Sequence, residues 1–330
     1  MYNSKMKRLI TNYLIIATVA VSVSVASCDK KESEGESKIA GIEGISFENY
    51  PKVDGSTSTS VLNMMVGCKL LDVPYRWVAP GVVTEWTLHP KYEELPEQYK
   101  NFFWQYIKSS QTHGAFINLI DGEADIILTH RIISPDEKAH ADSRKVALIE
   151  TPIALDAFVF VVNKSNPVKS LTVEQVRKIY TGAITNWQQV GGKNEKIKVF
   201  TRPRNSGSEE VLRTLVMNGL EPADFPESSI GGMAQVFGEI LNNANGVCYT
   251  FNNYKDLQAR VPDSEVPKIS INGIFPDEKT VKNSTYPFVS KVYVAIRSDL
   301  DPNSMAYKLY EWLQSEEAKS IILECGFIAK

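Results

Sequence analysis

The chain has 330 residues, of which 43% are hydrophobic and 23% are charged, and its formal net charge is −3. This composition is typical of a globular protein of about two domains, and it excludes a mainly disordered chain, a coiled coil and a small disulfide-stapled module. The weak net charge offers no sequence-wide basic field for nucleic acid. Residues 9–27 form the one long uncharged stretch, which excludes a protein with several membrane spans.

The N-terminal segment has the pattern of a secretory signal. The uncharged stretch at 9–27 follows a basic start made of Lys5, Lys7 and Arg8. We expect a signal peptide at 1–27, with an uncleaved membrane anchor as the alternative.

The stretch closes on small residues followed by Cys28, which resembles a bacterial lipobox, so Cys28 is the expected lipidation site. The next residues, 29–38, hold no apolar side chain. They predict a flexible tether over 28–44, which would leave the rest of the protein in water beside a membrane.

The remaining cysteines are Cys68, Cys248 and Cys325, an odd number in an oxidising compartment. Each lies in an apolar context, so we expect buried free thiols and at most one disulfide. Their wide spacing and the presence of only four histidines predict no metal site, and nothing in the sequence indicates a cofactor.

Short apolar runs alternate with amphipathic stretches along the chain. The predicted strands are 126–128, 158–162, 197–200, 247–249 and 292–296. Helix starts are indicated at Ser134, Thr172 and Ser206, each followed three residues later by Glu or Gln, and an amphipathic pattern covers 305–323. This alternation predicts an α/β fold with mainly parallel sheets flanked by helices.

Three loops place hydroxyl groups and glycine directly before a predicted helix. They cover residues 54–60, 109–114 and 202–208, and the third also carries Arg202 and Arg204. Free backbone N–H groups at a helix start, together with arginine, suit a tetrahedral oxyanion. A single loop of this kind is usually explained by helix capping, but three in one chain favour an anion site.

Residues 163–187 include Asn163, Asn166-Pro167, Leu171-Thr172, Glu174-Gln175 and Asn186-Trp187. This run, followed by a strand and the loop 202–208, resembles the signature of the phosphate-binding proteins of ABC uptake transporters. The resemblance covers most of 53–330. It implies a two-lobed, type 2 periplasmic-binding-protein fold, with lobe I formed by 45–155 plus 286–330 and lobe II by 156–285.

The resemblance also implies a function without chemistry: a monomeric protein that captures inorganic phosphate between its lobes and delivers it to an ABC permease in the membrane. Carried over position by position, the phosphate ligands would be Ser56, Thr57, Thr112, Arg131, Arg202, Ser206, Gly207 and Ser208.

The chain departs from the family pattern at His113, in the loop 109–114, and at His130, in the turn 129–131, where smaller residues are usual in the family. Some family members use an aspartate to accept the proton of hydrogen phosphate. Asp54 and Asp125 are candidates here, although an aspartate beside a tight turn is more often a local brace. Discrimination against sulfate and other oxyanions therefore stays open at this point.

Residues 75–106 hold nine of the 32 aromatic residues. They are expected either to add packing to lobe I or to form an aromatic face for a larger ligand, such as an organic phosphate or a glycan fragment. A rival from another class is a phosphoesterase, with Ser206 as nucleophile and His113 or His130 as base. The absence of a Gly-x-Ser-x-Gly elbow disfavours it.

Overall fold

The computed structural model describes residues 41–79 and 85–329, all of which lie in one contact unit, Ser33–Lys330. The predicted signal peptide at 1–27, the lipidation site Cys28 and most of the tether at 28–44 lie outside the described residues. Among the helices that are described, none has the length and apolar character that a membrane crossing requires.

The helices follow the pattern expected from the sequence. Their bounds are α1 Ser60–Leu70, α2 Phe102–Tyr106, α3 Gln111–Asp121, α4 Pro135–Arg144, α5 Val173–Tyr180, α6 Gly207–Val211, α7 Gln235–Asn242, α8 Glu278–Lys282, α9 Met305–Trp312 and α10 Glu316–Glu324. Shorter helical turns include Thr57–Thr59, which leads into α1, and two π-helical segments, Leu212–Met217 after α6 and Tyr254–Ala259 after β8.

The predicted helix starts are confirmed in their local chemistry. Complete capping boxes open α4 at Ser134 and α5 at Thr172, because the cap side chain and the third helical residue bond to each other's backbone N–H groups. At α6, Ser206 Oγ accepts the Glu209 N–H at 3.3 Å, but the Glu209 carboxylate turns to other partners.

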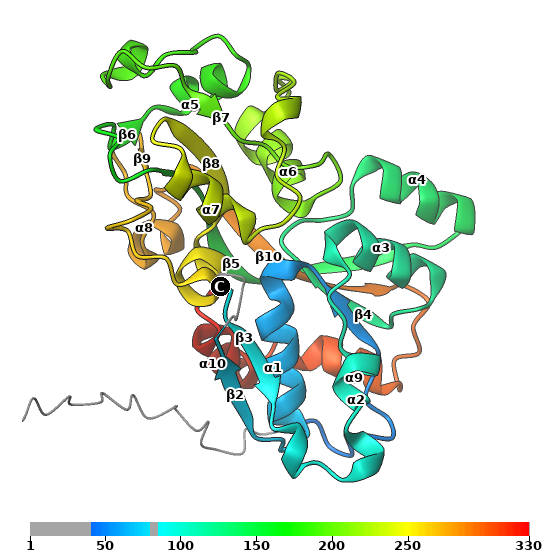
Figure 1. Cartoon of the computed structure of the whole chain (residues 1–330). Coiled ribbons are helices and arrows are strands. Elements are labelled where there is room, and N and C mark those ends of the chain that lie inside the picture. Colours follow the sequence, from blue (N-terminus) through cyan, green and yellow to red (C-terminus); the bar gives the residue numbers. More distant parts are fainter. Residues whose placement is uncertain (1–40, 80–84, 330) are drawn as a thin grey trace, which may run out of the picture. The chain divides into compact units, whose positions relative to one another are not determined.

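The strands are β1 Val53–Gly55, β2 Tyr75–Val78, β3 Thr87–Pro90, β4 Ile126–Thr129, β5 Leu148–Val162, β6 Ser170–Leu171, β7 Lys198–Val199, β8 Gly246–Phe251, β9 Ser270–Ile271, β10 Val289–Arg297 and β11 Ile328–Ala329. The main sheet has the order β1-β4-β10-β5-β8-β7, with β11 beside β5. Figure 1 shows β5 and β10 running between a group of helices around α1, α3 and α10 and a second group around α5 to α8.

The α/β class is confirmed, but the expectation of mainly parallel sheets is wrong for the described residues. Parallel pairing is found between β1 and β4, β7 and β8, and β6 and β9. The long strands β5 and β10 run antiparallel to each other, and β4 and β8 pair antiparallel with them. The cause is that β5 leads the chain out of the first half of the sheet and β10 leads it back, so the two strands run in opposite directions.

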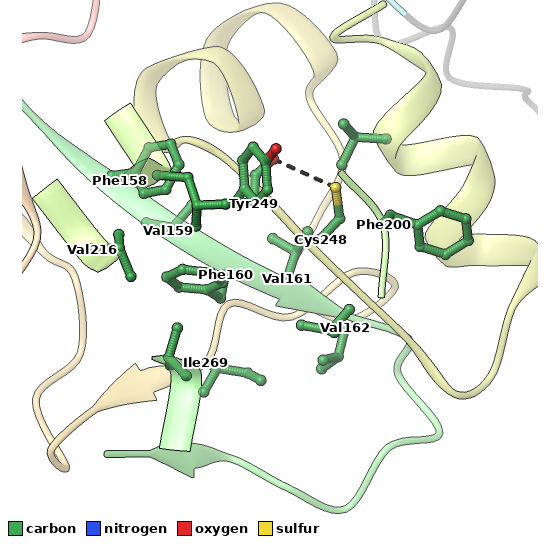
Figure 2. Packing of buried hydrophobic residues seen from close by; sticks show 14 of the residues in the cluster. Phe158, Val159, Phe160, Val161, Val162, Phe200, Val216, Cys248, Tyr249 and Ile269 are labelled. Atoms are coloured by element: carbon green, nitrogen blue, oxygen red, sulfur yellow. Dashed lines mark hydrogen bonds between the residues drawn. The ribbon is translucent and has the colours of Figure 1, made fainter. Parts of the chain in front are cut away.

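Two hydrophobic clusters form the main cores. One gathers buried residues of 50–154 and 292–327, and the other gathers buried residues of 157–288. The second core is centred on Phe158, Phe160 and Tyr249, whose rings meet at tilted or edge-on angles (Figure 2). Cys68, Cys248 and Cys325 are free and buried in these cores, which confirms the expected buried thiols.

Candidate functional site

Loops from both cores line one small cavity. Its lining contains Ser56, Thr57, Ser58, Gln111, Thr112, Arg202, Ser206, Gly207, Ser208, Met233 and Phe251. The cavity measures about 20 Å³, and because a single water needs about 10–15 Å³ by a comparable measure, only a ligand of a few atoms fits. The structure therefore brings together seven of the eight ligands expected from the sequence, Arg131 being the exception.

Two side chains of this lining carry buried polar atoms without a partner among the described residues. They are Arg202, through Nε and Nη1, and Ser208, through Oγ. Arg202 is 8% exposed and Ser208 is 3% exposed, so water satisfies these groups poorly. Burial lowers the pKa of the Arg202 guanidinium from its ordinary value. Buried donors without acceptors are costly, and here both side chains belong to the lining of the cavity.

A buried hydrogen-bond network holds the Arg202 loop in place. The Arg202 backbone N–H donates to the Tyr249 hydroxyl at 2.9 Å, and that hydroxyl donates to the Glu209 carboxylate. Glu209 is 2% exposed and also accepts from Arg213 Nε at 2.9 Å. Because Glu209 is already paired with Arg213, the charge of Arg202 stays available to a ligand.

The first loop is fixed where β1 ends and the helical turn before α1 begins. The Ser56 N–H donates to the Leu128 carbonyl at 3.1 Å, and Thr59 Oγ1 donates to the same carbonyl at 2.8 Å. Gly55 lies so close to β4 that a Cβ on this residue would clash with Leu128 O and with the side chains of Asn63 and Thr59. The close approach aims Ser56 and Thr57 at the cavity.

The loops 109–114 and 202–208 touch each other across the cavity, where α3 and α6 contact each other (Figure 1). A Cβ on Gly207 would clash with Thr112 Oγ1, so only glycine allows this approach. Gln111, the first residue of α3, has a φ of +63° in the left-handed region. Such a backbone is uncommon for a residue other than glycine and is frequent at ligand sites.

Asp54 and Asp125 do not line the cavity, and both act as the local braces that their positions suggested. Asp54 accepts the Ser110 N–H at 2.9 Å and Asn118 Nδ2 at 2.7 Å, which joins the first loop to the second. Asp125 accepts the Lys52 N–H at 2.8 Å.

Arg131 lies in the turn that follows β4 but does not line the cavity. Its guanidinium forms a bidentate pair with the buried carboxylate of Glu137, at 2.7 and 2.6 Å. Glu137 stands in the first turn of α4, where it also completes the capping box. An arginine already neutralised in this way has little charge left for an anion, so the residues that face the cavity do not include it.

The arrangement needed for the phosphoesterase is missing from the described residues. Ser206 Oγ caps α6 rather than contacting a histidine. His113 Nδ1 pairs with Glu137 at 2.9 Å, and His130 pairs with Ser58 and Asp156. His130 is buried, with 2% of its surface exposed.

Sequence reasoning did not single out four residues of the lining: Ser58, Gln111, Met233 and Phe251. Ser58 and Gln111 lie inside loops that the sequence marks as anion-binding, so their positions in these loops could have predicted that they line the cavity. Met233 and Phe251 come from segments without polar motifs and add an apolar wall that only packing of distant segments could reveal.

The aromatic segment mainly adds packing to the first core, as one of the two alternatives predicted. Tyr75, Phe102 and Phe103 are buried in that core, whereas Trp104 is 70% exposed. A hollow of about 560 Å³ lies between this segment and α1, and Tyr92, Phe103 and Trp104 are part of its lining.

The chain is similar in sequence to proteins named as phosphate-binding proteins. The chain is 28% identical over 195 residues to the phosphate-binding protein PstS of Bacillus subtilis, covering 58% of this chain and 61% of that protein. It is 25% identical over 251 residues to the PstS of Staphylococcus haemolyticus, covering 74% and 78%. The match to the Bacillus protein thus spans about three-fifths of that relative's length.

Solved structures share the fold. A putative phosphate ABC transporter substrate-binding protein from Clostridium perfringens, solved with bound phosphate, superimposes with a TM-score of 0.61 at 21% identity, covering 84% of this chain and 98% of that one. An ABC-type phosphate transport receptor from Vibrio cholerae gives 0.59 at 23% identity, covering 84% and 99%. A family model described as the PBP superfamily domain matches residues 77–317, and the chain therefore belongs to the PBP superfamily.

Proposed function

We propose that this chain is the substrate-binding component of an ABC-type uptake system and captures inorganic phosphate in the cavity beside Arg202. The observation that carries the proposal is the set of buried donors without acceptors, Arg202 Nε and Nη1 with Ser208 Oγ, around a space for a few atoms. The similarity to phosphate-binding proteins supports it.

The proposed ligands are Ser56, Thr57, Thr112, Arg202, Ser206, Gly207 and Ser208. Arg202 supplies the single charge of the lining, and the neutral hydroxyl and backbone N–H groups complete the shell around the anion. Binding replaces the hydration of phosphate by fixed dipoles, so the protein performs no chemical step.

We further propose that the two cores correspond to two lobes, with boundaries near 45–155 plus 286–330 and 156–285. Tyr286 and Phe288 pack in the second core, so the return to the first lobe lies between Phe288 and Val292. Ligands from both lobes meet in the cavity, which would let an anion hold the lobes together. The protein would act as a monomer, anchored through Cys28 at the bacterial cell envelope beside its permease.

The test is isothermal titration of the full chain with phosphate, after carried-over ligand has been removed by partial unfolding and dialysis. We expect one-to-one binding that Arg202→Ala weakens by at least about a hundredfold, because the anion loses its only charged donor. Arg204→Ala is the matched control, since Arg204 is exposed on the same loop. Equal affinity in all three proteins would remove Arg202 from the site.

A further inference from the structure

A buried chain of three polar side chains ends at the cavity. Ser58 Oγ lies 2.8 Å from His130 Nδ1, and His130 Nε2 lies 3.2 Å from Asp156 Oδ2. Their exposed fractions are 4%, 2% and 2%, and Ser58 belongs to the cavity lining. None of the anion ligands proposed above requires this chain, so its role needs a separate explanation.

The direction of the hydrogen bonds is set at the Asp156 end. The backbone N–H groups of Ala157 and Asn253 both donate to Asp156 Oδ1, at 2.7 and 3.1 Å, and these bonds favour the ionised form of the carboxylate. An ionised Asp156 then receives the proton of His130 Nε2. A neutral imidazole with its proton on Nε2 has a bare Nδ1, and that nitrogen accepts the hydroxyl proton of Ser58.

The neighbouring hydroxyl groups leave the Ser58 oxygen as an acceptor. Thr59 Oγ1 donates to the Leu128 carbonyl at 2.8 Å, and Ser56 Oγ lies 3.1 Å from Ser58 Oγ and 3.0 Å from Thr59 Oγ1. Ser56 keeps its proton for an anion or for one of these oxygens. The Ser58 proton is engaged by His130, so the Ser58 oxygen is left to accept a hydrogen bond at the cavity that Ser58 lines.

We propose that Ser58 is the specificity-determining acceptor of this site, with His130 and Asp156 as positioning residues, and that it selects oxyanions that carry a proton. The inference rests on the proposed function. Hydrogen phosphate and sulfate have the same charge of −2 and the same tetrahedral shape, but only hydrogen phosphate can donate a proton to Ser58. Sulfate would place an oxygen against the lone pairs of Ser58, and the repulsion excludes it.

At low pH the direction of the hydrogen bonds that join Ser58, His130 and Asp156 is reversed. The groups that face the His130 ring are Ser58, the Asp156 carboxylate from β5, and the rings of Phe251 from β8 and Phe327, whose centroids lie at 3.9 and 5.5 Å. Burial raises the pKa of Asp156, so its carboxyl takes up a proton at a higher pH than an exposed aspartate, and the protonated Asp156 donates to His130 Nε2. Nδ1–H then donates to Ser58, whose own proton becomes free to bind a fully ionised anion.

The experiment compares phosphate and sulfate on the full chain at pH 8.5 by calorimetry, with competition where binding is weak. For Ser58→Ala we expect the preference for phosphate over sulfate to fall by at least about tenfold, because no acceptor remains. Asp156→Asn is the second variant, and its amide can donate to Nε2 and reverse the chain. Ser290→Ala is the matched control, since this buried hydroxyl donates to the Asp156 backbone carbonyl at 3.2 Å and lies outside the chain of three.

The second measurement is the sulfate affinity of the wild type over a series of pH values. If Ser58, His130 and Asp156 only stabilised the fold, this affinity would not depend on pH. Sulfate stays fully ionised as the pH is lowered from 8.5 to the lowest value at which the protein stays folded, so tighter sulfate binding at lower pH reports the protein, and Ser58→Ala should remove this trend. An unchanged preference for phosphate in folded Ser58→Ala, or a pH trend in sulfate affinity that Ser58→Ala leaves in place, overturns the inference alone. A wild type that binds neither anion overturns the proposed function as well.

Discussion

At the scale of single residues, the site depends on which buried charges already have partners. Arg131 and Arg202 are both buried arginines in loops marked by the sequence. Glu137 pairs with both terminal nitrogens of Arg131, which leaves only its Nε without a partner, whereas Arg202 keeps Nε and Nη1 without partners among the described residues. These pairings determine their roles: Arg131 holds its loop against α4 through Glu137, and Arg202 is proposed to bind the ligand. A buried donor without an acceptor lowers the stability of the empty protein.

This cost predicts the effect of Arg202→Met on the ligand-free protein. Replacing the unpaired guanidinium by an apolar side chain should raise the free energy of unfolding by about 1–3 kcal/mol while phosphate binding is lost. Urea denaturation with and without phosphate measures both effects. Arg204→Met, on the exposed part of the loop, should stay within about 0.5 kcal/mol. A ligand-free Arg202→Met that is clearly less stable than the wild type would contradict this account.

At the scale of elements, glycine at one contact decides how closely two helix starts approach. Gly207 is the first residue of α6 and lies directly against Thr112 of α3. The local sequence of neither helix predicts this contact. The loops that carry the anion ligands thus depend on each other for their positions.

Gly207→Ala should therefore weaken phosphate binding by at least about tenfold, because the added Cβ separates the two loops by a fraction of an ångström. The fold should remain, as judged by circular dichroism. Gly238→Ala is the control: this glycine lies inside α7 with open space around it, so alanine there should add about 0.5–1 kcal/mol of stability without changing binding. Equal affinity in both variants would show that the loop contact does not shape the cavity.

The hairpin of β2 and β3 also contacts the segment Tyr254–Ala259 and its C-terminal neighbour Arg260. The Arg260 guanidinium lies 4.7 Å from the Trp77 ring centroid and 4.0 Å from that of Trp86. The backbone N–H of Trp86 donates to the Gln258 backbone carbonyl at 2.7 Å, and Gln258 Nε2 donates to the Ser58 backbone carbonyl at 3.3 Å. Part of the aromatic segment thus joins the first core to the second beside the cavity.

Arg260→Gln should lower the free energy of unfolding by about 1–2 kcal/mol, because two cation–π contacts at a partly exposed site are lost. Urea denaturation of the ligand-free protein measures this loss, and Arg204→Gln, which removes an exposed arginine elsewhere, should have little effect. A loss below about 0.3 kcal/mol would show that the two indole rings hold the hairpin without Arg260.

At the scale of the whole molecule, the proposed function requires a domain in water that stays close to a membrane permease. Charge and composition favour such a domain, and the sequence places its expected anchor at Cys28, outside the described residues. Lipid chains on one cysteine would hold the protein at the membrane without a spanning helix.

Cys28→Ser should accordingly move the protein from the membrane fraction to the soluble fraction while phosphate binding stays unchanged. Fractionation of cells followed by titration of the released protein measures both properties. Ser33→Ala, a change in the expected tether, should leave the protein in the membrane fraction. A Cys28→Ser protein that remains there would point to an uncleaved anchor at residues 9–27.

The sequence by itself determined the α/β class, the capped helices at Ser134 and Thr172, the buried thiols and the loops that carry the cavity's hydroxyl groups. These features follow from periodicity and from hydrogen bonds within a few residues, which local sequence encodes directly. Only the tertiary structure decided that β5 and β10 are antiparallel, that Arg131 is neutralised by Glu137, and that Ser58, His130 and Asp156 form one chain. The physical reason is that the partner of a buried polar group is chosen by the packing of distant segments, and such packing leaves no mark on local spacing.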